Sequence, residues 1–249
     1  MKFGKTGHEV EVNIATRAAL FQTVRDHLTR QTGFALATLN LDHLTKLPVD
    51  GEFLEAYRAH DLIVADGRPV VWLSQLARHP LELMPGSDLI LPLCAICAEL
   101  DAPIALIGSS DAALEGAAAA LIERTPGLRV LFLHAPPYGF DPQGAAADDI
   151  LTDLTHSGAA LCFIALGAPK QEIFAARGRE KAPNVGFASI GAGLDFLSGH
   201  QVRAPKIMRM FALEWLWRAL QSPRRMIPRY ARCFAILPGL ALDAARSRR

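Results

Sequence analysis

The sequence predicts an α/β protein with a mostly parallel, Rossmann-like sheet that helices cover on both faces. Five or six short runs of Val, Ile, Leu and Ala alternate along the chain with longer segments that are typical of helices. The runs are apolar at nearly every position, as in strands that are buried on both faces. The length of 249 residues and the 51% hydrophobic content suit one large domain, alone or with an appendage.

The first half of the chain opens the alternation of strands and helices. Thr16 is a good N-cap, so a helix is expected directly after it. Asp66-Gly67 ends a short apolar run, and Gly86-Ser87-Asp88 opens a long helix. The expected strands are residues 9–15, 33–40 and 61–65, and the expected helices are residues 17–30, 41–47, 51–60 and 68–78.

The second half repeats this alternation up to Gly199, and then the pattern changes. After Gly199 we expect only helices, with Trp and Leu interleaved with Arg. The expected strands are residues 103–107, 129–134, 159–166 and 184–190, and the expected helices are residues 111–124, 143–157, 169–179, 204–220 and 224–234.

Polar residues end most of the predicted strands. In parallel sheets the ligands bind beyond the carboxyl ends of the strands, so these residues are expected to converge on one rim. A Gly-x-Gly-x-x-Gly fingerprint for dinucleotides does not follow the first strand. The rim residues are Thr38, Asn40, Asp66, Gly108, Ser109, His134, Tyr138, Gln171 and Gly191.

Two groups of rim residues have both a chemical and a structural interpretation. Asp66 is placed to deprotonate a hydroxyl, or it is simply a turn-forming Asp before Gly. Thr38 and Asn40 alternate at a strand end and so share a face, where they either bind sugar hydroxyls or represent ordinary strand-end polarity. Asp88 is largely explained as capping, and His43 beside Asp42 is more often structural than a base.

Two glycine-rich loops place backbone N–H groups at helix starts, which suits a diphosphate. They are 167–171, Gly-Ala-Pro-Lys-Gln, and 191–193, Gly-Ala-Gly. Such loops also occur without ligands, so neither is specific alone. Lys170 faces either phosphate or water.

The cysteines and the apolar runs restrict the class of protein. Cys94 and Cys97 form a Cys-x-x-Cys pair that raises redox and zinc interpretations, but it lies in an apolar helix without a second ligand pair. Reduced core cysteines are the plainer interpretation. The first residues lack the apolar core of a signal peptide, and the longest apolar runs are too short to span a bilayer, so we expect no integral membrane protein.

A net charge of +1 conceals a strong asymmetry. Residues 203–249 contain 11 Lys and Arg against 2 Asp and Glu, whereas residues 1–202 contain 15 against 23. The basic tail has three interpretations: it forms solvated helix faces, it binds nucleic acid, or it is an amphipathic segment at a membrane surface. Trp and Leu beside Arg favour the membrane, and the acidic body disfavours nucleic acid.

Taken together, the motifs resemble the WecG/TagA/CpsF family of bacterial glycosyltransferases. They occur in family order with family-like spacing over most of residues 33–230. The matching stretches are TLNLDHLTKL (38–47), ADGRPVVWLSQL (65–76), PGSDL (85–89), PPYGFDP (136–142), ALGAPKQEIF (165–174), IGAGLDFLSG (190–199) and RAPKIMRMFALEWLWRALQSPRR (203–225).

The resemblance implies inverting transfer of a sugar from a UDP-sugar to a polyprenyl-diphosphate-linked glycan, in exopolysaccharide or cell-envelope polysaccharide synthesis. The implied donors carry N-acetylmannosamine, a hexuronic acid or glucose. The implied location is cytoplasmic, peripheral on the inner face of the cytoplasmic membrane. Residues 1–202 would form the catalytic domain and residues 203–249 a membrane-associating appendage; a homo-oligomer is possible.

The resemblance also implies roles for individual residues. Asp66 matches the base that activates the acceptor hydroxyl. The resemblance implies that no metal is required, and this agrees with the sequence, in which Asp148-Asp149 lies in a predicted helix and no Asp-x-Asp lies in a suitable loop. Some members have an arginine at the position of Leu83, for which Arg68 is a possible substitute. The implied substrate contacts are Thr38, Asn40 and Gln171 for sugar and acceptor, Tyr138 and Asp195 for the nucleotide, and the basic residues Arg203, Arg218, Arg224 and Arg225.

Two other functions remain open from the residues alone. A non-catalytic protein that binds nucleotide-sugars at the membrane would keep the glycine loops but release no UDP. A Rossmann-type oxidoreductase is disfavoured by the missing dinucleotide fingerprint, but NAD bound to the purified protein would support that function.

Overall fold

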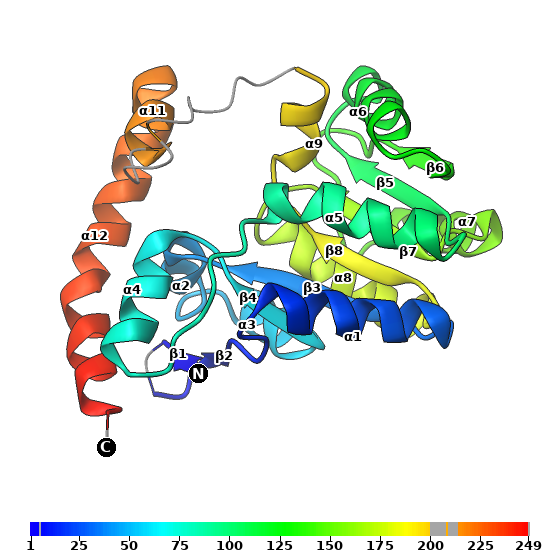
Figure 1. Ribbon diagram of the computed structural model, residues 1–249. Coiled ribbons are helices and arrows are strands. Elements are labelled where there is room, and N and C mark those ends of the chain that lie inside the picture. Colours follow the sequence, from blue (N-terminus) through cyan, green and yellow to red (C-terminus); the bar gives the residue numbers. More distant parts are fainter. Residues whose placement is uncertain (5, 200–207, 209–213, 249) are drawn as a thin grey trace.

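A computed structural model of the chain confirms the predicted fold class (Figure 1). The structure describes residues 1–4, 6–199, 208 and 214–248. Its centre is a six-stranded sheet in the order β4-β3-β8-β7-β5-β6, and all neighbouring strands are parallel. The strands are β3 (Phe34–Leu39), β4 (Leu62–Ala65), β5 (Ile104–Gly108), β6 (Val130–His134), β7 (Leu161–Ala165) and β8 (Gly186–Ser189).

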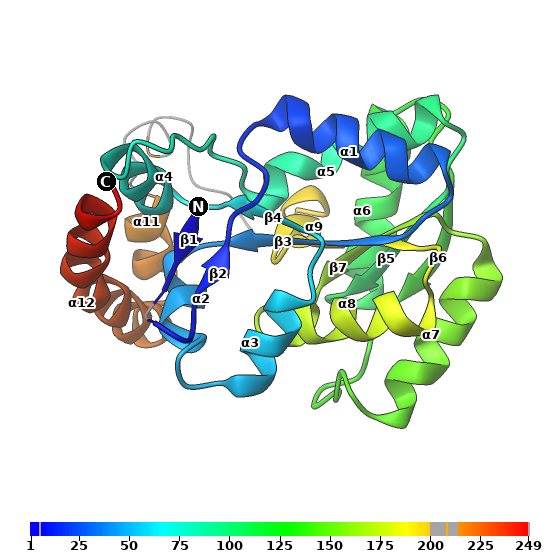
Figure 2. The same cartoon turned by 90° about the horizontal axis from the view of Figure 1, so that it is seen from below.

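Helices cover both faces of the sheet, as Figure 2 shows in a view along its plane. The short apolar strands fit this arrangement, because parallel strands joined by helical crossovers are buried on both sides. One face carries α1 (Arg17–Thr29), α5 (Gly86–Glu99) and α6 (Asp111–Arg124), and the other carries α3 (Gly51–Arg58), α7 (Ala145–Ser157) and α8 (Lys170–Lys181).

Strand register divides the core between these two faces. Leu106 of β5 lies opposite Phe163 of β7, and both side chains pack into the core beneath α1 and α5. Their neighbours Ala105 and Cys162 are also opposite each other, but they pack on the face of α7 and α8. All four side chains are fully buried. The alternation therefore divides the core between the two faces, and the parallel direction of the strands brings their carboxyl ends to one edge.

The prediction of a strand over residues 9–15 is wrong beyond Glu11. β2 (Val10–Glu11) pairs only with β1 (Lys2–Phe3), in a small antiparallel sheet. The reason lies in Asn13, whose side chain accepts from Ile63 N and donates to the Asp61 carbonyl, at 2.8 Å each. These side-chain bonds occupy backbone groups beside β4, so the segment follows the sheet edge without becoming a strand.

The C-terminal helices pack on the body of the protein. α11 (Glu214–Gln221) leads into α12 (Pro223–Arg246), which continues well beyond the predicted end at residue 234. Figure 1 shows both helices on the side toward which β3 points. The inner face of α12 joins the core of α2 (Leu41–Lys46) and α4 (Arg68–Leu76) through Cys233, Ile236, Leu237, Leu240, Ala241 and Ala244.

Several other predictions concern this region. No strand follows Gly199 among the described residues, as expected. Residues 204–207 and 209–213 of the predicted helix lie outside the described residues. The division of the chain at residue 202 stays a prediction. Within the described ranges, no helix combines the length and apolar character needed to cross a membrane.

The structure also shows the surroundings of the cysteines and of Asp148. All four cysteines are free and buried, and burial raises the pKa of the Cys97 thiol to about 12. In the part of the chain that the structure describes, no group of three His, Cys, Asp or Glu is suited to a metal ion. Asp148 lies in α7, as predicted, with an ion pair of 2.7 Å to Arg177.

Candidate active site

Asp66 and Asn40 lie side by side at the carboxyl edge of the sheet. The register pairs Leu39 with Ala65, so the next residue of each strand, Asn40 or Asp66, emerges at the same level. Asp66 N–H donates to the Leu39 carbonyl at 2.8 Å. The Asn40 amide donates through Nδ2 to Asp66 Oδ2 at 3.4 Å. Asp66 is half-buried, which suits a carboxylate that meets a substrate at a rim.

Asn40 also begins α2. Its Oδ1 accepts from His43 N–H at 3.1 Å, so it is the N-cap of this short helix. The cap bond turns Nδ2 toward Asp66. Thr38, which was expected to share an exposed face with Asn40, has a side chain that is 5% exposed. Thr38 takes part in the hydrogen bonds of the site through its backbone carbonyl, which accepts from Tyr57 O–H at 2.9 Å.

A neutral polar network lies beneath this pair. His43 Nδ1 is 2.9 Å from the Tyr57 hydroxyl, and His43 Nε2 is 3.4 Å from Asn40 Nδ2. Burial lowers the pKa of His43 to about 3, so its imidazole is neutral at physiological pH. Burial, with the nearby Glu172 and Asp66, raises the pKa of Tyr57. His43 is therefore a buried, hydrogen-bonded residue with a structural role, as the sequence analysis favoured, and is not an exposed base.

A charged cluster lies on the other side of α2. Asp42 forms ion pairs with Lys46 Nζ at 2.8 Å and Arg229 Nε at 3.0 Å, and its side chain is 8% exposed. Burial acts to raise the pKa of Asp42, but Lys46 and Arg229 outweigh it and lower the pKa. Lys46 Nζ also donates to the Ala168 carbonyl at 3.1 Å. The cluster thus joins α12, α2 and the loop after β7.

Gln171 connects the loops after β7 and β8. Its Oε1 accepts from Gly191 N–H at 3.1 Å, and its Nε2 donates to Glu172 Oε1 at 2.8 Å. Gln171 is 2% exposed and Glu172 is fully buried. Burial raises the pKa of Glu172 to about 7, against the hydrogen bond from Gln171. The predicted contact of Gln171 with a sugar stays a prediction.

The rim glycines have different reasons for being glycine. A Cβ at Gly108 would lie 2.5 Å from the Ala165 carbonyl oxygen, so close approach of β5 and β7 explains this position. Gly167 and Gly191 have φ angles of 72° and 60°, and a Cβ there would meet nothing within 4 Å. At these two positions the positive φ angle, and not crowding, favours glycine. Lys170 Nζ donates to the Phe140 carbonyl at 2.6 Å, and its predicted contact with phosphate or water stays a prediction.

The two predicted nucleotide contacts lie in the loops at the β5–β6 side of the rim. Asp195 is in α9 (Gly193–Leu197), after β8, and its Oδ1 accepts from the Ser109 hydroxyl. Tyr138 follows β6 and is fully exposed. β6 and β4 are the opposite edges of the sheet, so their ends are five strand spacings, or about 24 Å, apart. The structure brings Asp66, Asn40, Gln171 and Gly191 to the middle and one side of the rim. The loop that contains Tyr138 begins at the other side and is joined to the start of α8 by the bond from Lys170 to the Phe140 carbonyl.

The predicted arginines are only partly described. Arg224 and Arg225 are exposed in the first turn of α12. Arg203 and the side chain of Arg218 lie outside the described residues. At the position where some relatives have an arginine, the Leu83 carbonyl accepts from Arg17 at 3.0 Å. Arg68 is half-buried at the first residue of α4, directly after Asp66-Gly67.

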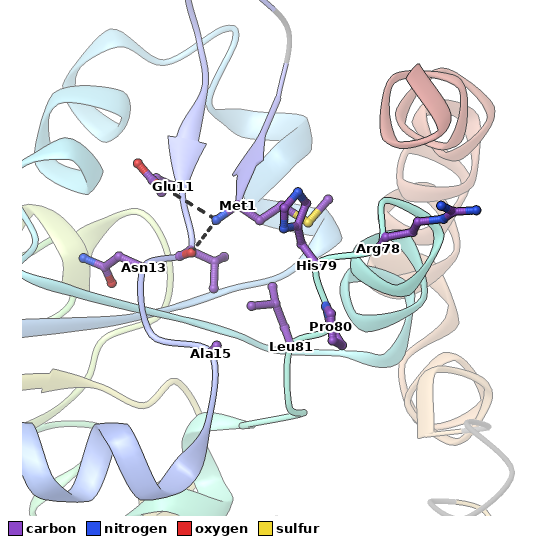
Figure 3. Close-up of a pocket in the computed structure, with 9 residues that line it drawn as sticks. Met1, Glu11, Asn13, Ala15, Arg78, His79, Pro80 and Leu81 are labelled. Atoms are coloured by element: carbon purple, nitrogen blue, oxygen red, sulfur yellow. Dashed lines mark hydrogen bonds and ion pairs between the residues drawn. The ribbon is translucent and has the colours of Figure 1, made fainter. Parts of the chain in front are cut away.

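A surface pocket of about 370 Å³ lies elsewhere, between the N-terminal strands and the loop after α4 (Figure 3). Arg78, His79 and Leu81 line one side of it, and Glu11 and Asn13 line the other. No predicted rim residue lines this pocket. The candidate site is therefore defined by the convergence of polar groups on the rim and not by this cavity.

A comparison with known protein families identifies the family of the chain. A model of the Glycosyl transferase WecG/TagA/CpsF family matches residues 7–249, nearly the whole chain. The chain belongs to this glycosyltransferase family. The resemblance inferred from the motifs is thereby confirmed, and the protein is a glycosyltransferase of cell-envelope polysaccharide synthesis.

Five residues around the rim of this glycosyltransferase were not among the predicted site residues. Asp42 and Lys46 are four residues apart, the spacing of a helical ion pair, and this was a usable signal. Glu172 follows Gln171 directly, but its complete burial has no signature in the sequence. Tyr57 and Arg229 reach the site only through tertiary packing.

Proposed function

We propose that this glycosyltransferase transfers a sugar of N-acetylmannosamine, hexuronic acid or glucose type from a UDP-sugar to a polyprenyl-diphosphate-linked glycan. Asp66 accepts the proton of the acceptor hydroxyl. The acceptor oxygen forms a bond to the anomeric carbon on the face opposite the leaving group. UDP departs with the electron pair of the broken C–O bond, and the anomeric configuration inverts.

The observation that carries this proposal is the Asp66 carboxylate beside the Asn40 amide, at the carboxyl edge where α/β sheets bind ligands. A hydrogen bond from an amide stabilises an ionised carboxylate, which is the form that a base needs. The half-buried position leaves part of the Asp66 side chain open to an acceptor.

The diphosphate of the donor needs positive charge or hydrogen-bond donors as it leaves. The loops at Gly167 and Gly191 precede α8 and α9. The backbone N–H groups at the start of the long helix α8 suit a phosphate group. We propose that these groups, with arginines from the C-terminal helices, stabilise the leaving charge without a metal ion.

The test of the base is UDP release by wild type and Asp66→Asn, screened over UDP-N-acetylmannosamine, UDP-glucuronate and UDP-glucose with a polyprenyl-diphosphate-linked acceptor. Loss of a general base lowers the rate by about 10²–10⁴-fold. Asp50→Asn is the matched control, because Asn also caps α3 well. Full activity of Asp66→Asn would show that Asp66 is not the base. Donor binding without UDP release by wild type would favour the non-catalytic alternative.

The surface of α11 and α12 supports a peripheral position on the inner face of the cytoplasmic membrane. Exposed apolar and basic side chains alternate on it, as in helices that lie in a membrane interface. The apolar ones are Trp215, Leu220, Ile227, Phe234 and Leu242, and the basic ones include Arg224, Arg225 and Arg232.

Charge reversal tests the membrane proposal better than removal of residues 203–249, because removal would uncover the core beneath α12. The double variant Arg224→Glu with Arg225→Glu should bind anionic phosphatidylglycerol vesicles at least tenfold more weakly, since each basic residue near such a surface contributes about 1 kcal/mol. The control is Arg124→Glu on α6. Unchanged flotation of the double variant would contradict the proposal.

A further inference from the structure

The hydrogen bonds beneath Asp66 determine where the protons of His43 lie. Tyr57 donates its only hydroxyl proton to the Thr38 carbonyl at 2.9 Å. The Tyr57 oxygen must then accept at its 2.9 Å contact with His43 Nδ1. His43 Nδ1 therefore carries a hydrogen, and Nε2 of the neutral ring is an acceptor.

The same reasoning orients the Asn40 amide. Its Oδ1 accepts from His43 N–H at 3.1 Å. One proton of Nδ2 points to His43 Nε2 and the other to Asp66 Oδ2, at 3.4 Å each. A flipped amide would place its oxygen against the lone pair of His43 and the carboxylate of Asp66. All donors and acceptors of the Asn40 amide are matched in one orientation only.

We infer that His43, fixed by Tyr57, is a positioning residue that orients the Asn40 amide and so keeps the Asp66 carboxylate aimed at the acceptor. This inference rests on the proposed role of Asp66 as the base. His43 is 4% exposed and Tyr57 is fully buried, so both act through Asn40 and not on the substrate.

The surroundings of His43 restrict its movement. The Phe53 ring meets His43 edge-on with centroids 5.7 Å apart, and Tyr57 meets it at 5.8 Å. The charged groups nearest the ring are Asp42, Lys46 and Arg229, and both cations pair with Asp42. The imidazole is thus held by aromatic packing and by the Tyr57 hydroxyl.

Two substitutions at His43 separate positioning from packing. In His43→Gln the amide oxygen takes the place of Nε2 and can still accept from Asn40. In His43→Asn the amide N–H takes the place of Nδ1, so the contact to Tyr57 remains and the acceptor is lost. We expect kcat for UDP release to fall about tenfold in His43→Asn and to stay within about threefold in His43→Gln, with the donor KM unchanged in both.

The measurement uses the full chain, the best donor of the UDP-release screen and a polyprenyl-diphosphate-linked acceptor. The acid limb of the pH–rate profile should move to higher pH in His43→Asn and not in His43→Gln, because only the first loosens the donor to Asp66. Equal losses of kcat in the two variants, with unmoved acid limbs, would overturn the inference and leave His43 a packing residue.

A second measurement needs no substrate and uses only the wild-type protein, so it tests the inference even if the variants fold poorly. In wild type, ¹⁵N NMR of His43 should show hydrogen on Nδ1 and no titration between pH 5 and 8. Hydrogen on Nε2 would overturn the inference. Failure of the proposed function is a different result: Asp66→Asn would keep full activity, while the tautomer of His43 would stay as assigned.

Discussion

The two sides of the short helix α2 hold the candidate active site by different means. On one side His43 and Tyr57 connect Asn40 to Asp66 through neutral hydrogen bonds. On the other side Asp42 binds Lys46 and Arg229 through charges. Neutral bonds in a buried network keep one geometry across the physiological pH range. Charged bonds join elements that are distant in the sequence, and they depend on each partner remaining paired.

The largest effect on stability is expected from breaking the charged side. Asp42 is 8% exposed, whereas Lys46 and Arg229 are about a third exposed and can be partly solvated. Asp42→Asn leaves both cations without their carboxylate and should lower the free energy of unfolding by about 2–3 kcal/mol, at or below the lower end of the range for a fully buried pair. Urea unfolding measures this. Asp243→Asn, in an exposed pair with Arg246, is the control and should change it by at most about 0.5 kcal/mol. Equal effects of the two variants would mean that the ion pairs of Asp42 contribute no more to stability than an exposed pair.

The neutral side makes a prediction about acid. The pKa of His43 is about 3 in the folded protein and 6.5 in the unfolded chain, so the unfolded chain binds more protons below pH 6.5. The stability from neutral His43 is present above pH 6.5 and is lost as the pH falls toward 3. Between pH 6.5 and 4.5 wild type should lose about 2–3 kcal/mol relative to His43→Gln.

Urea midpoints at several pH values, compared between wild type and His43→Gln, measure this difference. The carboxylate of Asp42, whose pKa is lowered from 3.8, contributes only at the acid end of the same scale. Parallel curves for the two proteins would show that His43 is charged or exposed, and would remove the contrast between the two sides of α2.

Glu172 should give a smaller effect of the opposite sign. Its pKa is about 7 in the folded protein against 4.5 in the unfolded chain, so the folded protein binds more protons between these values. Stability is complete below pH 4.5 and falls as the pH rises through 7. Relative to Glu172→Gln, wild type should lose about 2 kcal/mol between pH 5 and 8. A wild-type advantage that grows with pH would contradict this.

The smallest effect is expected at an exposed pair. Arg25 and Glu99 join α1 and α5 at 2.6 Å, but their side chains are 36% and 59% exposed. Arg25→Gln should change the free energy of unfolding by less than about 0.5 kcal/mol, and salt should change wild type and variant alike. A loss as large as that of Asp42→Asn would show that burial does not distinguish these ion pairs.

The sequence predicts the sheet and its rim well because both follow from local patterns. Apolar runs mark the strands, and the rule that ligands bind beyond the carboxyl ends brings Asn40 and Asp66 to one edge, where the structure places them. The strand expected over residues 9–15 fails because the bonds of Asn13 to β4 depend on tertiary contact.

The remainder of the site depends on contacts between distant parts of the chain. Arg229 and Asp42 are 187 residues apart in the sequence, and no local spacing predicts their ion pair. The Lys170 ammonium turns to the Phe140 carbonyl, which no pattern near Lys170 indicates. Gln171 was predicted as a sugar contact by resemblance, and its bonds to Gly191 and Glu172 appear only when α8 is packed.

The central claim is that Asp66 is the base of a glycosyl transfer from a UDP-sugar. The most direct measurement is the single-turnover rate of UDP release by Asp66→Asn, with the donor Kd measured on the same protein. We predict a rate at least about 100-fold below wild type with an unchanged donor Kd. A wild-type rate in Asp66→Asn, at equal donor affinity, would contradict the account.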